Sequence, residues 1–131
     1  MNSMLIRKYN LPFTHLVVWN NGKSVMLENV LVDTGSASTI LKLARVDEID
    51  LVATEEDAFG SISGVGGKEL IFYKTVDAIE LGDIRIEGFE VDIGHMNYGN
   101  DLMIDGIIGM DLLQRLKANI NLEELILTCK L

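Results

Sequence analysis

The residues best suited to do chemistry are Asp33, Thr34, Gly35 and Ser36, which follow directly on an apolar run. A carboxylate at the end of a buried strand can accept a proton from water or donate one, according to its ionisation. Gly35 lets the backbone turn tightly because it has no side chain. Thr34 and Ser36 add hydroxyl groups, which can each donate and accept a hydrogen bond beside the carboxylate.

Two such carboxylates held about 3 Å apart cannot both ionise, so they share one proton. The ionised member can activate a water, and the protonated member can donate to an oxygen on which charge develops. The sequence carries Asp-Thr-Gly-Ser once, so a second copy of the chain would have to supply the second carboxylate. An ordinary corner between a strand and a turn is the alternative interpretation, because Asp, Gly and Ser are common turn residues.

A second motif lies late in the chain, where the segment Asp105–Gly109 is followed by Met-Asp-Leu-Leu. This pattern predicts a buried strand from Leu102 to Ile108 and a helix from Met110 to Lys117. Asp111 would stand in the first turn of that helix, where the helix dipole favours a carboxylate. A plain buried strand that ends at a helix start would give the same pattern.

In this order, the two motifs resemble the active-site half of an aspartic peptidase of the retropepsin-like group, whose members are single-domain and dimeric. The resemblance covers roughly Leu16 to Leu116. It implies a homodimer in which Asp33, Thr34 and Gly35 are catalytic, without a metal or another cofactor. In the family, this threonine bonds the partner chain's loop, and a serine at the place of Ser36 bonds the outer oxygen of the aspartate.

A glycine-rich segment between the two motifs predicts a hairpin with strands from Ala58 to Ser63 and from Glu69 to Ile79. In retropepsin-like enzymes a hairpin at this place is the flap, which folds over the substrate. The resemblance therefore assigns substrate contacts to Ser36, Ser63, Gly64, Val65, Gly66 and Gly67. A phosphate-binding loop is rejected, because no Gly-Lys-Ser/Thr sequence and no helix follow the glycines. A surface hairpin without a role remains the alternative.

Further hairpin turns are predicted at Asn20–Lys23, where Asn-Gly suits positive φ, and at Gly82–Asp83. Another hairpin is predicted within Ala118–Thr128, whereas Ala37–Ile49 fits a strand or a short helix. Together with the resemblance, these elements predict an all-β fold. The expected architecture is a closed retropepsin-like acid-protease barrel or sandwich with one short helix near the C-terminus and one lobe per chain. We expect one domain over residues 1–131.

The charge and composition of the chain limit the classes of binding partner that are expected. The net charge of −9 makes nucleic acid and anionic membranes poor partners. The hydrophobic fraction of 48% is high for a small soluble domain, and formation of a homodimer would account for part of it. Cys129 is the only cysteine, so an intrachain disulfide is excluded. No signal peptide or membrane-spanning run is recognisable, so a cytoplasmic protein is expected.

The sequence gives little support for a metal site or for a catalytic histidine. His15 and His95 are the only histidines, too few with one cysteine for a structural zinc site, and a structural or surface role is expected for both. A serine or cysteine nucleophile paired with histidine is not excluded by sequence distance, but neither histidine lies in a recognisable motif. Four aspartates could suggest calcium, but their spacing does not fit a calcium loop, so a solvated loop and a helix start are expected. They are Asp92, Asp101, Asp105 and Asp111.

Two classes of function remain. The first is an endopeptidase, active as a homodimer on a protein or peptide substrate. The second is a non-catalytic, dimeric interaction module that keeps the retropepsin fold. The intact Asp-Thr-Gly triplet favours catalysis, because a binding module does not need a paired carboxylate. The substrate is not readable: Leu31, Ile62, Val65 and Ile107 would line apolar subsites or belong to the core.

Overall fold

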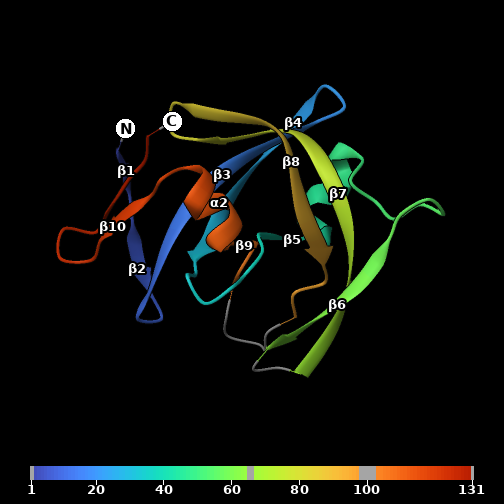
Figure 1. Cartoon of the computed structure of the whole chain (residues 1–131), viewed down its shortest axis with the longest axis horizontal. Coiled ribbons are helices and arrows are strands. Elements are labelled where there is room, and N and C mark those ends of the chain that lie inside the picture. Colours follow the sequence, from blue (N-terminus) through green and yellow to red (C-terminus); the bar gives the residue numbers. More distant parts are fainter. Residues whose placement is uncertain (1, 65–66, 98–102, 131) are drawn as a thin grey trace.

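Strands dominate the computed structural model, which describes residues 2–64, 67–97 and 103–130 (Figure 1). The elements, in chain order, are β1 (Asn2–Met4), β2 (Ile6–Lys8), β3 (Leu11–Asn20), β4 (Lys23–Val32), β5 (Ile40–Lys42), α1 (Leu43–Val46), the 3₁₀ helix η1 (Asp47–Ile49), β6 (Phe59–Gly64), β7 (Gly67–Leu81), β8 (Ile84–Gly94), β9 (Gly106–Ile108), α2 (Met110–Arg115), β10 (Asn119–Asn121) and β11 (Ile126–Thr128).

The main sheet closes on itself. Its strand order is β2-β3-β4-β9-β5-β8-β7-β6, and β3 pairs in addition with β7. Because β3 contacts both β4 and β7, the sheet curls into a barrel, which Figure 1 shows as strands wrapped around a common interior. The predicted closed all-β architecture is therefore confirmed.

Local turn chemistry explains the hairpins. Asn21 and Gly22 both have positive φ, 54° and 76°, as a two-residue turn with the twist of its flanking strands requires. Gly82, with φ of 59°, makes the turn between β7 and β8. Both turns were predicted, and so was the hairpin of β10 and β11.

The structure differs from the sequence-based prediction at two element boundaries, the start of β9 and the end of α2. The strand expected from Leu102 is shorter: β9 begins at Gly106, whereas Met103 and Ile104 are not in a strand and Leu102 lies outside the described residues. The predicted helix ends at Arg115, two residues early. The ambiguous segment Ala37–Ile49 contains both alternatives, since the strand β5 is followed by α1 and η1.

The strand β9 lies in the middle of the sheet, parallel to β4 and antiparallel to β5. All three of its residues are buried, so the strand has no polar face. Its register places Val32, the last residue of β4, beside Ile108. The two motifs found in the sequence therefore end side by side at one edge of the barrel.

Most buried apolar side chains form one core between the barrel and α2, but a smaller cluster is separate. This second cluster consists of Phe13, Ile40, Met96, Ile104 and Ile107, with Leu31 and Ile62 packed against it. It therefore brings together three of the four residues for which subsite and core interpretations were open. The fourth, Val65, lies outside the described residues.

The two ends of the described chain meet in a small second sheet with the order β1-β11-β10. Asn2 lies opposite Thr128, and Asn119 lies opposite the same residue from the other side. In Figure 1 this sheet lies on the side of the barrel that α2 covers. Across the described residues, no helix has the length and apolar character needed to cross a membrane.

Candidate active site

Asp33 stands directly after β4 on a turn that main-chain groups fix. Its amide donates to the Ile108 carbonyl oxygen at 3.0 Å, and its carbonyl oxygen accepts a bond from the Ser36 amide at 3.2 Å. The Gly35 amide donates to Asp33 Oδ1 at 2.8 Å. The Asp33 side chain is half-buried, while Thr34 and Gly35 are exposed. The Asp33 carboxylate is therefore oriented by one backbone donor, the Gly35 amide, and remains accessible.

The start of α2 holds the far side of this turn. The Met110 amide donates to the Ser36 carbonyl oxygen at 2.7 Å. The Asp111 carboxylate accepts bonds from the Thr39 amide at 3.1 Å and from Thr39 Oγ1 at 2.8 Å. Thr39 is fully buried, and its Oγ1 accepts a bond from the Gly109 amide at 3.2 Å. The segment 33–39, named the Asp loop here, is thus fastened to β9 and α2 at several points.

Ser36 differs from the expectation that the resemblance gave. Its hydroxyl donates to the Ser38 carbonyl oxygen at 2.8 Å. A hydroxyl has one proton to give, and here the Ser38 carbonyl oxygen accepts it. Within the described chain, Ser36 therefore braces the loop and does not donate to the outer oxygen of Asp33.

Asp92, on β8, supports the end of the Asp loop. Its Oδ2 accepts a bond from the Ser38 hydroxyl at 2.6 Å, and its amide donates to the Thr39 carbonyl oxygen at 2.9 Å. The side chain is only 7% exposed. Burial raises the pKa of the Asp92 carboxyl, the Ser38 bond partly opposes this, and the charges of Asp111 and Glu90 raise it further.

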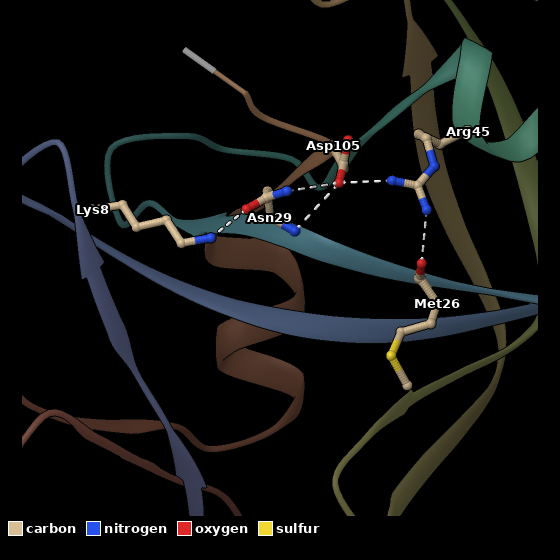
Figure 2. Close-up of polar contacts among 5 residues, drawn as sticks. All are labelled: Lys8, Met26, Asn29, Arg45 and Asp105. Atoms are coloured by element: carbon tan, nitrogen blue, oxygen red, sulfur yellow. Dashed lines mark hydrogen bonds and ion pairs between the residues drawn. The ribbon is translucent and has the colours of Figure 1, made fainter. Parts of the chain in front are cut away.

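Asp105 lies behind the Asp loop and is 5% exposed. Its Oδ2 accepts bonds from Arg45 Nη1 at 2.9 Å and from the Asn29 amide and side-chain nitrogens, both at 3.3 Å. Figure 2 shows that these donors converge on one carboxylate oxygen, while Arg45 also donates to the Met26 carbonyl oxygen and Lys8 to Asn29 Oδ1. Asp105 therefore ties α1 to β4, the strand that ends at Asp33.

The expectation that Asp92 and Asp105 belong to solvated segments is wrong. Both are buried and accept bonds from residues that are distant in sequence, Ser38 for Asp92 and Asn29 and Arg45 for Asp105, which one sequence does not reveal. Asp111 is at a helix start, as predicted, and Asp101 lies outside the described residues. Across residues 2–64, 67–97 and 103–130, no group of three His, Cys, Asp or Glu side chains is placed to hold a metal ion. Both histidines are exposed, which agrees with a surface role.

The predicted glycine-rich hairpin is present as β6 and β7, which extend away from the barrel in Figure 1. Ser63 is exposed and lies opposite Lys68, and Gly64 lies opposite Gly67. Val65 and Gly66 lie outside the described residues, so their predicted substrate contacts remain predictions. Ile62 packs against the second cluster, which connects the hairpin to Ile107 beside the Asp loop.

Thr34 borders a hollow of about 370 Å³ next to α2. Its other lining residues come from α2 and the segment leading to β10: Met110, Leu113, Gln114, Lys117, Ala118 and Ile120. Most of these side chains are apolar or contribute apolar stems. The exposed face of the Asp-Thr-Gly turn is therefore continuous with an apolar depression.

The sequence did not identify Ser38 and Thr39 as supporting residues. It also did not reveal that Asp92 supports the Asp loop. A weak signal existed for Thr39, since a hydroxyl residue directly before the apolar pair Ile40–Leu41 needs a partner if it is buried. No comparable signal existed for Asp92, whose partners are distant in sequence.

The buried Asp92 predicts a pH dependence of stability. Because its folded-state pKa is raised above 3.8, the folded protein holds this proton over a range in which the unfolded chain has lost it. The free energy of unfolding should therefore decrease as pH rises from about 4 through the raised pKa. Asp92→Asn should remove this part of the slope. Urea unfolding between pH 4 and 7 measures it, with Asp83→Asn in an exposed turn as the control; equal slopes in all three proteins would contradict the assignment.

Comparison with known proteins agrees with this geometry. A family model described as aspartyl protease matches residues 16–112. No curated protein sequence is similar enough to match. The fold resembles a retropepsin-like aspartic protease from Rickettsia conorii, with a TM-score of 0.67 and 19% identity over 97% of this chain and 89% of the other.

Two further solved structures share the fold. EIAV protease, in a complex with the inhibitor HBY-793, has a TM-score of 0.62 and 23% identity, over 89% of this chain and 98% of that protease. The retroviral protease-like domain of Ddi1 from Leishmania major has a TM-score of 0.58 and 20% identity, over 90% and 88%. The family match spans both motifs and the segment between them, so the chain belongs to the aspartyl protease family and has a retropepsin-like fold.

Proposed function

We propose that this chain is a single-domain aspartic endopeptidase that is active as a homodimer. The observation that carries the proposal is the Asp33 turn: one accessible carboxylate, oriented by the Gly35 amide at 2.8 Å, on a loop fastened to β9 and α2. A rigid turn of this kind can hold two carboxylates close together across a two-fold axis. The described chain provides one of the two.

The chemistry then follows from the pair. Two Asp33 carboxylates that share one proton provide a base and an acid at the same time. The ionised member takes a proton from a water, whose oxygen attacks the peptide carbonyl carbon. The protonated member donates to the carbonyl oxygen as negative charge develops there. Thr34 is exposed and would contact the same loop of the partner chain. The hydrogen bonds of buried Thr39 would hold the Asp loop in a fixed conformation.

The β6–β7 hairpin would serve as the flap. Support comes from its exposed apolar side chains, Phe59 at 53% and Leu70 at 65% exposure, and from the contact of Ile62 with the second cluster. A hairpin that closes over a peptide excludes water and orients the substrate. Ser63, Gly64 and Gly67 lie at the end of the hairpin, where a bound peptide would pass. The second cluster would form an apolar wall of the cleft, so the proposed substrate is an extended peptide with apolar side chains.

The experiment is cleavage of a peptide library, read by mass spectrometry, across a pH series and a dilution series. We expect a bell-shaped rate with an acidic optimum, because both limbs belong to one pair of carboxylates. Activity per chain should decrease on dilution, since a monomer has half a site. Chelators should have no effect. A dimer that cleaves nothing at any pH would instead favour the non-catalytic interaction module.

A further inference from the structure

The outer part of the β6–β7 hairpin extends beyond the strand pairing of the barrel. The ladder between β7 and β8 begins at the pair Phe72 and Ile93, and in the described chain β6 pairs with β7 alone. The described residues of β7 before Phe72 therefore lie outside the barrel ladder. How this part of the hairpin is held against the cleft depends on the contacts of individual residues.

Glu69, on β7, makes one such contact. Its Oε1 accepts a hydrogen bond from the amide of Met96, a residue that follows β8 and is 2% exposed. Glu69 lies opposite Ile62 across the hairpin, so the two side chains share one face. Ile62 packs against the second cluster, which contains Met96. The same face of the hairpin is therefore joined to the segment after β8 by an apolar contact and by a hydrogen bond.

The backbone around Met96 leaves room for the Glu69 carboxylate. Gly94 ends β8, and a β-carbon there would lie 2.9 Å from Glu69 Oε1 and 3.0 Å from Ile71 Cγ2. The carboxylate therefore occupies space that a side chain at position 94 would fill. Met96 has a φ of 57°, which is uncommon for a residue with a side chain and persists where contacts hold it. Its amide bond to Glu69 and its side chain in the second cluster are two such contacts.

We propose that Glu69 is a positioning residue of the flap, whose bond to the Met96 amide holds the hairpin closed over the apolar wall that the second cluster forms. This inference rests on the proposed function and adds how the flap is held. A peptide binds productively only under a closed flap, so its apparent affinity is scaled by the closed fraction. Breaking the bond lowers that fraction and raises KM. At saturation the peptide itself holds the flap closed, so kcat changes little.

Kinetics on one peptide substrate test this role. Glu69→Leu removes the acceptor and should raise KM roughly tenfold, with kcat within about twofold of the wild type. Glu69→Gln keeps a side-chain oxygen, so its KM should stay within about threefold of the wild type. Gly94→Ala leaves Glu69 in the chain but displaces the end of its flexible side chain, so KM should rise as in Glu69→Leu. Glu28→Leu, the same change at an exposed position of β4, is the matched control and should keep the wild-type KM.

Hydrogen exchange of the Met96 amide, followed by NMR, tests the bond without reference to activity. Glu69→Leu and Gly94→Ala should accelerate this exchange at least about tenfold. The Asp92 amide, which donates to the Thr39 carbonyl oxygen, should keep its rate and so report an intact barrel.

The outcomes separate this inference from the proposed function. If the wild type cleaves peptides but Glu69→Leu changes neither the Met96 exchange nor KM, Glu69 does not hold the flap, and the peptidase assignment stands. Faster exchange with an unchanged KM would also overturn the inference, because the bond would then exist without positioning the flap. A rise of KM in Glu69→Gln as large as in Glu69→Leu would contradict the role of the oxygen acceptor. A wild type that cleaves no peptide would overturn the proposed function and the role of Glu69 with it.

Discussion

Asp33→Asn should abolish peptide cleavage and leave the fold and the dimer nearly intact. The change is isosteric, and the side-chain oxygen of asparagine can still accept the bond from the Gly35 amide, so the turn keeps its orientation. In the homodimer both positions change, and the pair then has no group that can hold or release the shared proton. The expected loss of kcat/KM is at least about 10³-fold.

A matched control separates lost chemistry from lost structure. Asp105→Asn makes the same substitution at a buried aspartate whose Oδ2 already accepts bonds from Arg45 and Asn29. It should lower the free energy of unfolding by about 1–3 kcal/mol, because a charge-assisted hydrogen bond is lost. At temperatures where the variant is folded, however, it should cleave the same peptides. Circular dichroism and sedimentation on both variants verify that fold and assembly are retained.

The opposite pattern would identify a different carboxylate. If Asp33→Asn still cuts while folded Asp105→Asn does not, the base is not Asp33. If both variants retain full activity, the paired-carboxylate mechanism itself is wrong. Either result is informative because the two aspartates flank the same strand pair, β4 and β9, but Asp33 is accessible whereas Asp105 is buried and ion-paired with Arg45.

The features that the sequence predicted well depend on local chemistry. Asn21 and Gly22 make their turn because few other residue pairs adopt positive φ at both positions. The Asp-Thr-Gly-Ser turn and the element Ile107-Ile108-Gly109 are also local, and each is recognisable without knowledge of the fold. Their meeting in space was implied only by the resemblance, and the parallel register of β4 with β9 now accounts for it.

The features that were missed depend on remote partners. An apolar run does not reveal where a strand stops: Ile104 is buried in the second cluster without strand pairing, which made β9 shorter than expected. Segment 37–49 was ambiguous because β5 exists through pairing with β8 and β9, far along the chain. Asp92 resembled a solvated carboxylate since aspartate is rarely buried unless paired. Its donor, Ser38, is brought to it only by the folded Asp loop.

Gly109→Ala should have the largest effect on folding. A β-carbon at this position would lie 2.3 Å from the Ser38 carbonyl oxygen and 2.8 Å from that of Ser36. Both atoms are main chain of the Asp loop, so no side-chain rotation relieves the overlap. The backbone of Gly109 has φ of −93° and ψ of −176°, which any residue adopts, so the whole cost comes from this contact. The loop must move away from α2 and give up the bond from the Met110 amide to Ser36.

The expected cost of Gly109→Ala is about 3–5 kcal/mol, a large part of the stability of a domain of this size. Gly88→Ala is the control, since Gly88 has φ of 65° and nothing within 4 Å of its added carbon. That variant should lose only about 1–2 kcal/mol, the strain of a left-handed alanine. Urea unfolding compares the two, and cleavage assays on any folded Gly109→Ala protein should show activity lost with the displaced Asp loop. Equal stabilities of the two variants would mean that the Asp loop does not pack against α2 as closely as these distances require.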